Sequence, residues 1–233
     1  MATITIPATD GSGSFAAYVS QPKPSPDPKG AVVLIQEVFG VNQAMRDIAD
    51  WVADLGFIAV CPDLFWRIEP NVDITDKTEA EWKKAFELFG KFDQVKGIED
   101  LKATVTTARG LTGANGKVAT MGYCLGGRLA FMMAEQSDVD VNISYYGVGL
   151  DGLLGDIGKV TKPLLVHIAD RDEYFPEAGR KAVAEGAKAN RQVVCYNYDA
   201  DHAFARVNGI HWDGLSAAIA NGRSAEALAR AIG

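Results

Sequence analysis

The residue best suited to chemistry is Cys124, which stands at the centre of the segment GYCLG at residues 122–126. This segment has the pattern G-x-S-x-G with cysteine in the serine position. The apolar run 117–123 predicts a buried strand, and a helix is expected at 126–135. A nucleophile in such a turn needs small neighbours, because the strand and the helix pass close together. Its sulfur would lie at the helix N-terminus, where backbone N–H groups favour a thiolate and a nearby oxyanion.

A thiol nucleophile needs a base, and the base needs a group that orients it. His202 follows the last predicted strand and is the expected base. Asp172 lies just past the preceding strand and is the expected acid, with Asp170 as a competitor two positions away. Cys124, Asp172 and His202 follow the chain order nucleophile, acid, histidine of the α/β-hydrolase fold. The sequence therefore predicts a cysteine hydrolase.

The other histidines and cysteines have simpler interpretations. His167 lies inside the apolar run PLLVHIA, which predicts a core histidine with a satisfied ring. His211 stands at the start of the last helical region and is expected to be peripheral. Cys61 and Cys195 each lie inside an apolar strand, which predicts buried structural cysteines. Such widely spaced cysteines make a poor disulfide framework, and without a CxxC pair they predict no metal site.

Glu37 follows a buried strand, at the place where this fold builds the second wall of an oxyanion hole. Two interpretations stay open for its side chain. It is either a solvated loop carboxylate, or it points inward, where it disfavours a thiolate and can itself accept the thiol proton. We expect the backbone N–H groups of Val38 and Leu125 to form the oxyanion hole.

The elements that position these residues alternate between strand and helix. Strands are expected at 3–6, 15–19, 31–35, 57–61, 117–123, 141–146, 163–168 and 192–198. Helices are expected at 42–55, 78–92, 94–109, 126–135, 176–189 and 215–232. This order predicts a doubly wound, mostly parallel sheet with helices on both faces and an edge hairpin at its start. Ligands bind at the carboxyl ends of such strands, where every candidate residue lies. The long connection 64–75 is expected to form a lid or a binding wall.

Length and composition restrict the class of protein. The 233 residues suit one large α/β domain, 1–233, and 48% hydrophobic with 23% charged residues indicates an ordinary globular protein. The net charge of -7 argues against a nucleic-acid partner. No apolar run has membrane-spanning length, and the N-terminus lacks the features of a signal peptide. We therefore expect a cytoplasmic monomer with a small-molecule substrate and no membrane partner.

Five segments carry a resemblance over nearly the whole chain. They are QEVFGVN at 36–42, VCPDLF at 60–65, GKVATMGYCLGGRLAF at 116–131, YYGVGL at 145–150 and DHAFAR at 201–206. In these segments the chain resembles the dienelactone hydrolases (carboxymethylenebutenolidases) of the α/β-hydrolase superfamily. The resemblance implies that Cys124, His202 and Asp172 form the triad. It also implies that Glu37 is an activating glutamate that pairs with Arg206 or with the thiol, and that no metal or organic cofactor is needed.

The family's reaction is implied in the same way. Substrate binding turns the glutamate at position 37 inward, where it removes the proton of the Cys124 thiol. The thiolate attacks the lactone carbonyl, and the ring opens as an enolate. Water then releases the acyl group with help from His202. The product is the keto diacid maleylacetate.

The family binds the carboxylate of its substrate with two arginines. One of them matches Arg206, whereas the other falls on Trp82 in the predicted helix 78–92. An arginine that forms a bidentate contact cannot be replaced without loss. The missing charge-assisted contact is worth on the order of 1.5–3 kcal/mol.

Further pocket positions also differ from the family. A pocket tyrosine aligns with Phe86, a pocket tryptophan with Phe89, and the small hydroxyl residue after the histidine is Ala203. Tyr145 resembles a pocket tyrosine that the family keeps. The more apolar helix predicts a less charged or bulkier lactone or ester.

Two alternatives to dienelactone hydrolysis stay open. One is a broad carboxylesterase or thioesterase with the same triad, which would hydrolyse simple aryl esters well and dienelactone badly. The other is a relative without turnover that binds a ligand or senses redox state through Cys124. The complete set of nucleophile, base, acid and Glu37 argues against the second alternative.

Overall fold

The computed structural model describes residues 2–233, which form two compact units. The N-terminal unit holds residues up to 118 together with 232–233, and the C-terminal unit holds 119–231. Eight strands follow the order β1-β2-β4-β3-β5-β6-β7-β8, with β5 (Ala114–Tyr123) contributing residues to both units. The alternation of strands and helices confirms the predicted α/β class. The single domain that we expect from the length stays a prediction.

The N-terminal unit begins with the predicted edge hairpin. Strand β1 (Ala2–Pro7) pairs antiparallel with β2 (Ser14–Ser20), and β2 pairs antiparallel with β4 (Ile58–Pro62). Strand β3 (Lys29–Ile35) runs parallel to β4, and six of its seven residues are buried. Such continuous burial is expected of a parallel strand that is covered on both faces.

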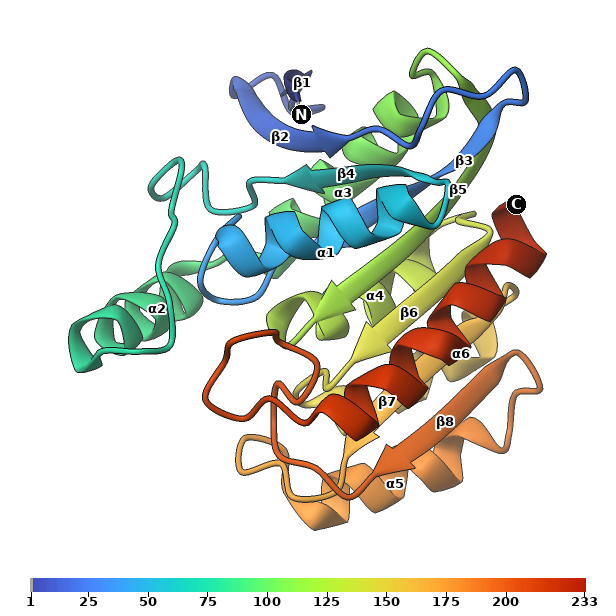
Figure 1. Cartoon of the computed structure of the whole chain (residues 1–233). Helices are drawn as coiled ribbons and strands as arrows, with labels where there is room; N and C mark the ends of the chain where they lie inside the picture. The colour runs from blue at the N-terminus through green and yellow to red at the C-terminus, as the bar shows by residue number, and fades with distance from the viewer. Residues whose placement is uncertain (1) are drawn as a thin grey trace. The chain divides into compact units, whose positions relative to one another are not determined.

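Three helices belong to the N-terminal unit, and their sequences explain where they begin. Helix α1 (Gln43–Asp54) starts after Asn42, whose side chain accepts a hydrogen bond from the backbone of Met45. Helix α2 (Glu79–Lys91) starts after Thr78 in the same way, and α3 (Gln94–Arg109) after Asp93. In Figure 1, α1 and α3 lie on opposite sides of β3 and β4.

The C-terminal unit has parallel pairings throughout. The end of β5 pairs with β6 (Val141–Tyr145), β6 with β7 (Leu164–Ala169), and β7 with β8 (Val193–Tyr198). Their carboxyl ends therefore share one edge, where β5 leads into α4 (Leu125–Gln136). This is the arrangement that the positions of the candidate residues require.

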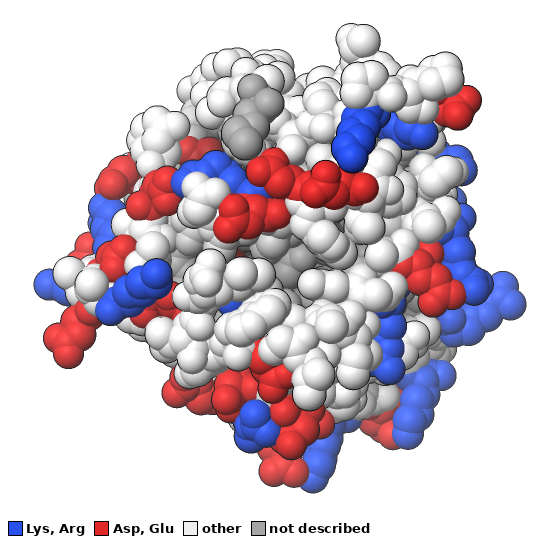
Figure 2. Space-filling model, in the orientation of Figure 1, with Lys and Arg blue, Asp and Glu red and all other residues white. Residues whose placement is uncertain are grey.

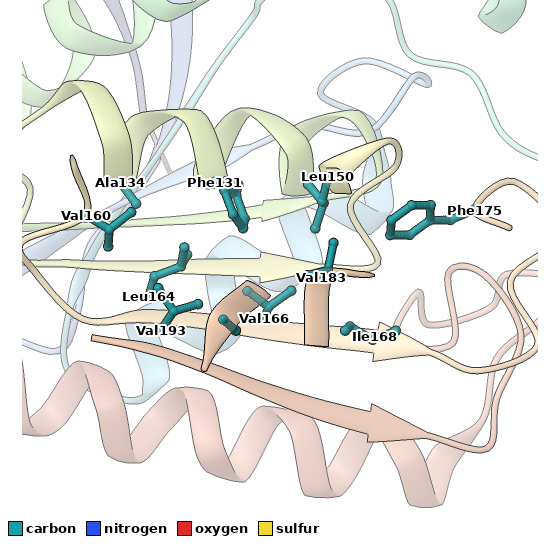
Figure 3. Packing of buried hydrophobic residues seen from close by; sticks show 11 residues of the cluster. Phe131, Ala134, Leu150, Val160, Leu164, Val166, Ile168, Phe175, Val183 and Val193 are labelled. Atoms are coloured by element: carbon teal, nitrogen blue, oxygen red, sulfur yellow. The ribbon is translucent and has the colours of Figure 1, made fainter. Parts of the chain in front are cut away.

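Helices cover both faces of these strands. Figure 1 shows α4 and α5 (Glu177–Ala187) on one face and α6 (Gly214–Ile232) on the other. The 3₁₀ helix η1 (Leu150–Lys159), for which the sequence indicated no element, packs against α4 and α5. Side chains from α4, η1, α5 and the strands meet in one hydrophobic cluster (Figure 3), made of Phe131, Ala134, Leu150, Val160, Leu164, Val166, Ile168, Phe175, Val183, Ala187 and Val193.

The surface carries mixed charge. Figure 2 shows groups of acidic and basic side chains around a largely uncharged central area of this face. Within residues 2–233, no helix is long and apolar enough to cross a membrane.

Candidate active site

Cys124 occupies a strained turn between β5 and α4. Its backbone has φ 57° and ψ -113°, a conformation that costs free energy for a residue with a Cβ atom. The backbone N–H of Cys124 donates to the carbonyl of Tyr145 at 3.1 Å. The carbonyl of Cys124 accepts from the backbone N–H of Arg128 at 3.1 Å. Both contacts hold the turn in place and leave the Cys124 side chain partly exposed.

The glycines around the turn are required by close backbone contacts. A Cβ atom on Gly122 would lie 1.9 Å from the carbonyl oxygen of Gly126. A Cβ atom on Gly127 would lie 2.4 Å from the carbonyl oxygen of Tyr145. Both distances are far shorter than any tolerated contact, which confirms the expectation that the nucleophile turn needs small neighbours.

His202 and Asp172 form a buried pair at the ends of β8 and β7. The distance from His202 Nδ1 to Asp172 Oδ2 is 2.7 Å, and the two side chains are 4% and 1% exposed. The other carboxylate oxygen of Asp172 accepts a hydrogen bond from the backbone N–H of Tyr174 at 2.9 Å. Asp170, the competitor for this role, is exposed and accepts instead from the amide of Asn197.

The charge state of His202 depends on its two partners. Burial alone would lower the pKa of this imidazole. The negative charge of Cys124, hydrogen bonds to Asp172 and to Cys124, and the charge of Asp172 outweigh burial and raise the pKa to about 10. The imidazole therefore contacts both groups, and it holds a proton at neutral pH when the sulfur is a thiolate.

Two tyrosine rings flank His202, and the sequence did not single out either one for this place. Tyr146 contacts the imidazole at a ring separation of 5.2 Å, and Tyr174 contacts it at 5.0 Å, both edge to face. Tyr146 has φ 36° and follows β6 directly, although the predicted strand included it. Tyr174 stands two residues after Asp172. Each tyrosine lies next to a strand end, and this position is the feature of the sequence that could have indicated a contact with His202.

The predicted pocket residues of the C-terminal unit have different surroundings. Leu125 is the first residue of α4, so its N–H has no acceptor within the helix. Arg206 is buried, as is Ala203, whose φ is 63°. Tyr145 is fully buried, and its hydroxyl contacts Ser224 Oγ at 2.7 Å and Asn221 Oδ1 at 3.0 Å.

The placement of Tyr145 does not support its predicted pocket role. Its hydroxyl is bound by α6, and its ring is stacked on Tyr123 at 4.6 Å. Tyr145 contributes to the turn through its carbonyl, which accepts the hydrogen bond from Cys124. It is the neighbouring Tyr146 whose ring lies against His202.

Glu37 and Val38 lie in the loop after β3 in the N-terminal unit. Only 2% of Glu37 is exposed, which rules out the interpretation as a solvated loop carboxylate. Gln36 fixes the loop, because its side chain donates to the carbonyl of Glu37 and accepts from the backbone of Leu64. The start of the connection 64–75 is therefore bound to the segment that carries Glu37.

Trp82 of α2 stacks on Phe86 and contacts Phe39 of the same loop edge to face. The Trp82 ring lies 5.0 Å from Phe39 and 5.5 Å from Phe86, and its indole N–H donates to the carbonyl of Asp76. Phe86 is 52% exposed and Phe89 is 38% exposed. Trp82, the position where the resemblance implied an arginine in the family, thus packs against Phe39, two residues from Glu37.

The other histidines and cysteines agree in part with expectation. His167 is fully buried with both ring nitrogens hydrogen-bonded, as predicted. His211 is less peripheral than expected, because its Nδ1 lies 3.1 Å from the carbonyl oxygen of His202. Cys61 is buried as predicted, whereas Cys195 is only partly buried. Burial raises the pKa of the Cys195 thiol to about 11.

Comparisons with known proteins extend over nearly the whole chain. The family described as "Dienelactone hydrolase family" matches residues 15–231. A "Putative carboxymethylenebutenolidase" of Azospirillum brasilense is 47% identical over 100% of both chains. "Carboxymethylenebutenolidase 1" of Cupriavidus pinatubonensis is 38% identical over 93% of this chain and 92% of its own.

A solved structure gives the same result for the fold. The crystal structure of a "Putative Dienelactone Hydrolase" from Klebsiella pneumoniae subsp. pneumoniae MGH 78578 has a TM-score of 0.84 at 24% identity, over 99% of this chain and 100% of that one. This similarity confirms the predicted α/β-hydrolase fold. The sequence matches go further: the chain belongs to the dienelactone hydrolase family of ester-hydrolysing enzymes.

Proposed function

We propose that the chain opens a dienelactone-type lactone, carboxymethylenebutenolide, to maleylacetate through a cysteine nucleophile. The observation that carries this proposal is the buried hydrogen bond between His202 and Asp172. The strained backbone of Cys124 supports it, because strain of this kind is retained where a side chain must be presented for chemistry.

In the proposed acylation step, the Cys124 thiolate attacks the lactone carbonyl carbon. A C–S bond forms, and the negative charge moves to the carbonyl oxygen. The backbone N–H groups of Leu125 and Val38 are the proposed donors to this oxyanion. The tetrahedral intermediate then cleaves the ring C–O bond, which yields a thioester and an enolate.

In the proposed deacylation step, His202 activates water. While the sulfur is a thiolate, its charge is one of the causes that raise the pKa of His202 to about 10. Acylation removes that charge, so the pKa of the imidazole falls. The imidazolium then gives its proton to the enolate, and the neutral His202 accepts a proton from the water that attacks the thioester. Asp172 holds the Nδ1 proton and orients the ring throughout.

Glu37 is the proposed acceptor of the thiol proton when substrate binds. Its burial supports this role, because the carboxylate lies inside the protein and not in solvent. Arg206 is the proposed partner of the substrate carboxylate. Ala203 and the aromatic side chains of Trp82, Phe86 and Phe89 are proposed to contact the rest of the substrate.

A broad carboxylesterase or thioesterase is the second candidate function. The observation that favours it is the aromatic stack of Phe39, Trp82 and Phe86 where the family has an arginine. One missing charge-assisted contact lowers affinity for an anionic substrate by roughly one to two factors of ten. Aryl esters without a charge would not suffer this loss.

The test compares initial rates on dienelactone, followed by ultraviolet absorbance, and on a simple aryl acetate. Wild type, Cys124→Ala and the matched control Cys195→Ala are measured side by side. We expect turnover of dienelactone that falls on the order of 10⁴-fold in Cys124→Ala and is retained in Cys195→Ala.

The other two outcomes would support a different function for the chain. Slow dienelactone turnover with fast, Cys124-dependent hydrolysis of the aryl acetate would support the broad esterase. No turnover of either ester would contradict both functions and favour the relative without turnover.

A further inference from the structure

Tyr174 is the one of the two tyrosines beside His202 that solvent reaches. Its side chain is 40% exposed, whereas Tyr146 on the other side of the imidazole is 2% exposed. The backbone of Tyr174 is fixed by the hydrogen bond from its N–H to Asp172, and its ring edge lies against the imidazole. One edge of the ring therefore contacts the imidazole of His202, and the rest of the ring is exposed.

The phenol of Tyr174 also lies within range of the nucleophile. Burial raises its pKa, the charge and hydrogen bond of Glu173 raise it further, and the charges of Cys124 and Asp172 add to them. The Tyr174 ring thus lies beside His202 and near enough to Cys124 for the charge of the sulfur to act on its phenol.

We call Glu173 and the exposed part of the Tyr174 ring the rim. Glu173 gives the rim a negative charge. Its carboxylate is exposed and accepts a hydrogen bond from the Tyr174 phenol. Asp170, Asp199 and Asp201 lie in the adjacent turns at the ends of β7 and β8. Figure 2 shows acidic side chains gathered over this end of the strands.

The nearby arginines are engaged by other partners. Arg171 forms ion pairs with Asp199 and Asp201. Arg180 donates to the backbone carbonyls of Asp170, Asp172 and Phe175. An anionic substrate that approaches beside Tyr174 meets the carboxylate of Glu173, whereas a flat uncharged group meets the open part of an aromatic ring.

From this arrangement we infer that Tyr174 and Glu173 tune substrate specificity, reducing the advantage of anionic lactones over flat, uncharged lactones and aryl or enol esters. Arg206, the proposed carboxylate partner, is buried, so the rim acts on approach and at the outer part of the bound substrate. This inference rests on the proposed function.

The experiment uses an anionic and an uncharged substrate with the same lactone ring, dienelactone and its methyl ester, and follows opening of the ring. Glu173→Gln removes the charge of the rim and keeps the acceptor for the phenol. We expect the ratio of kcat/KM for dienelactone to that for the methyl ester to rise about 2- to 4-fold at low salt, and to rise less at high salt. The matched control is Glu177→Gln, whose carboxylate pairs with Lys181 on α5, and the ratio should stay constant.

The ring is tested separately from the charge. Tyr174→Ala should lower kcat/KM for an aryl acetate about 2- to 12-fold more than for ethyl acetate, because only the aryl group loses an aromatic contact. Tyr174→Phe keeps the ring and should lose clearly less. Equal losses for both esters would overturn the role of the ring.

A measurement without turnover separates this inference from the proposed function. Alkylation of Cys124 by neutral iodoacetamide and by anionic iodoacetate gives the charge selectivity at the sulfur, read at Cys124 by mass spectrometry. Glu173→Gln should raise the iodoacetate to iodoacetamide rate ratio about 2- to 4-fold. An unchanged ratio overturns the inference even if dienelactone is hydrolysed. A raised ratio without hydrolysis supports an acidic rim and overturns the proposed function.

Discussion

Two histidines of the C-terminal unit are almost equally buried and have opposite charge preferences. His167 is fully buried on β7, and His202 is 4% exposed just after β8. Burial and the charge of Arg223 lower the pKa of His167 to about 3. Cys124 and Asp172 overcome burial and raise the pKa of His202 to about 10. The partners of the ring, and not its depth, decide whether a buried histidine carries a proton.

The hydrogen bonds around His167 fit one neutral tautomer. Arg223 donates to the Tyr198 hydroxyl at 2.9 Å, so that hydroxyl donates its proton to His167 Nδ1 at 2.8 Å. The Nε2–H then donates to Ser224 Oγ at 3.0 Å, and Ser224 donates to the Tyr145 hydroxyl at 2.7 Å. Each of these groups is satisfied without any charge on the ring.

This network links α6 to the strands. The pair of His202 and Asp172 links only the ends of β8 and β7, which are already neighbours. The alternation along β7 explains the difference. Leu164, Val166 and Ile168 point into the cluster of Figure 3, so His167 points to the opposite face, where α6 lies. We therefore expect substitutions at His167 to change stability and those at the His202 pair to change catalysis.

The largest expected effect is on catalysis. Asp172→Asn keeps the shape of the side chain but no longer holds His202 in the required tautomer. We expect kcat on an aryl acetate to fall about 10³- to 10⁴-fold. Asp170→Asn is the matched control and should stay within about 2-fold, because the Asp170 side chain contacts Asn197 and not His202. Similar losses in both variants would contradict the assignment of the acid.

His167→Phe should have the opposite profile. The ring volume is retained, but the Tyr198 hydroxyl and Ser224 lose a buried partner. We expect the free energy of unfolding in urea to fall by about 2–4 kcal/mol. The kcat on the aryl acetate should stay within about 3-fold at 20 °C. A loss of kcat above about 100-fold without a loss of stability would show that the two regions are not separable.

The pH dependence of stability should separate the two histidines. An unfolded histidine has a pKa of about 6.5. His167 resists protonation when folded, so its contribution is present above pH 6.5 and is lost as the pH falls from 6.5 toward 3. His202 binds its proton more tightly when folded, so its contribution is complete below pH 6.5 and is lost as the pH rises toward 10.

Urea unfolding at pH 4 to 10 measures both contributions. For one proton the slope is about 1.4 kcal/mol per pH unit within each range. His167→Phe should flatten the acid side of the profile, and His202→Gln should flatten the alkaline side. The prediction fails if either variant flattens the side assigned to the other.

The residue types at strand ends were sufficient to predict that His202 and Asp172 lie close together, that Cys124 stands in the turn after β5, and where most elements are. Asn42 and Thr78 act as the helix starts that the sequence indicates, because their capping contacts are local. The inward orientation of Tyr145 was not predictable, since its partners on α6 lie 76 and 79 residues away in sequence. The same holds for the ring of Tyr174 against His202.

Two further features escaped the sequence for physical reasons. The 3₁₀ helix Leu150–Lys159 is glycine-rich and lacks the 3.6-residue period by which helices are recognised. Glu37 is a carboxylate after a strand, and composition favours exposure for such a residue. Its burial became visible only in the folded structure.

The smallest expected effect comes from a single hydroxyl of the His167 network. Tyr198→Phe removes the donor to His167 Nδ1 and the acceptor for Arg223, while the ring stays in place. We expect the free energy of unfolding to fall by about 1–2 kcal/mol. Tyr196→Phe is the matched control, because Tyr196 contributes its ring, stacked on His167 at 5.9 Å and under Arg223 at 4.0 Å.

That control should stay within about 0.5 kcal/mol of wild type. A double variant with His167→Phe sharpens the comparison further. If the Tyr198 hydroxyl acts through His167, the loss from Tyr198→Phe should be smaller in the His167→Phe background than in wild type. Additive losses would mean that the hydroxyl stabilises the fold through Arg223 alone, and that the neutral tautomer of His167 does not depend on it.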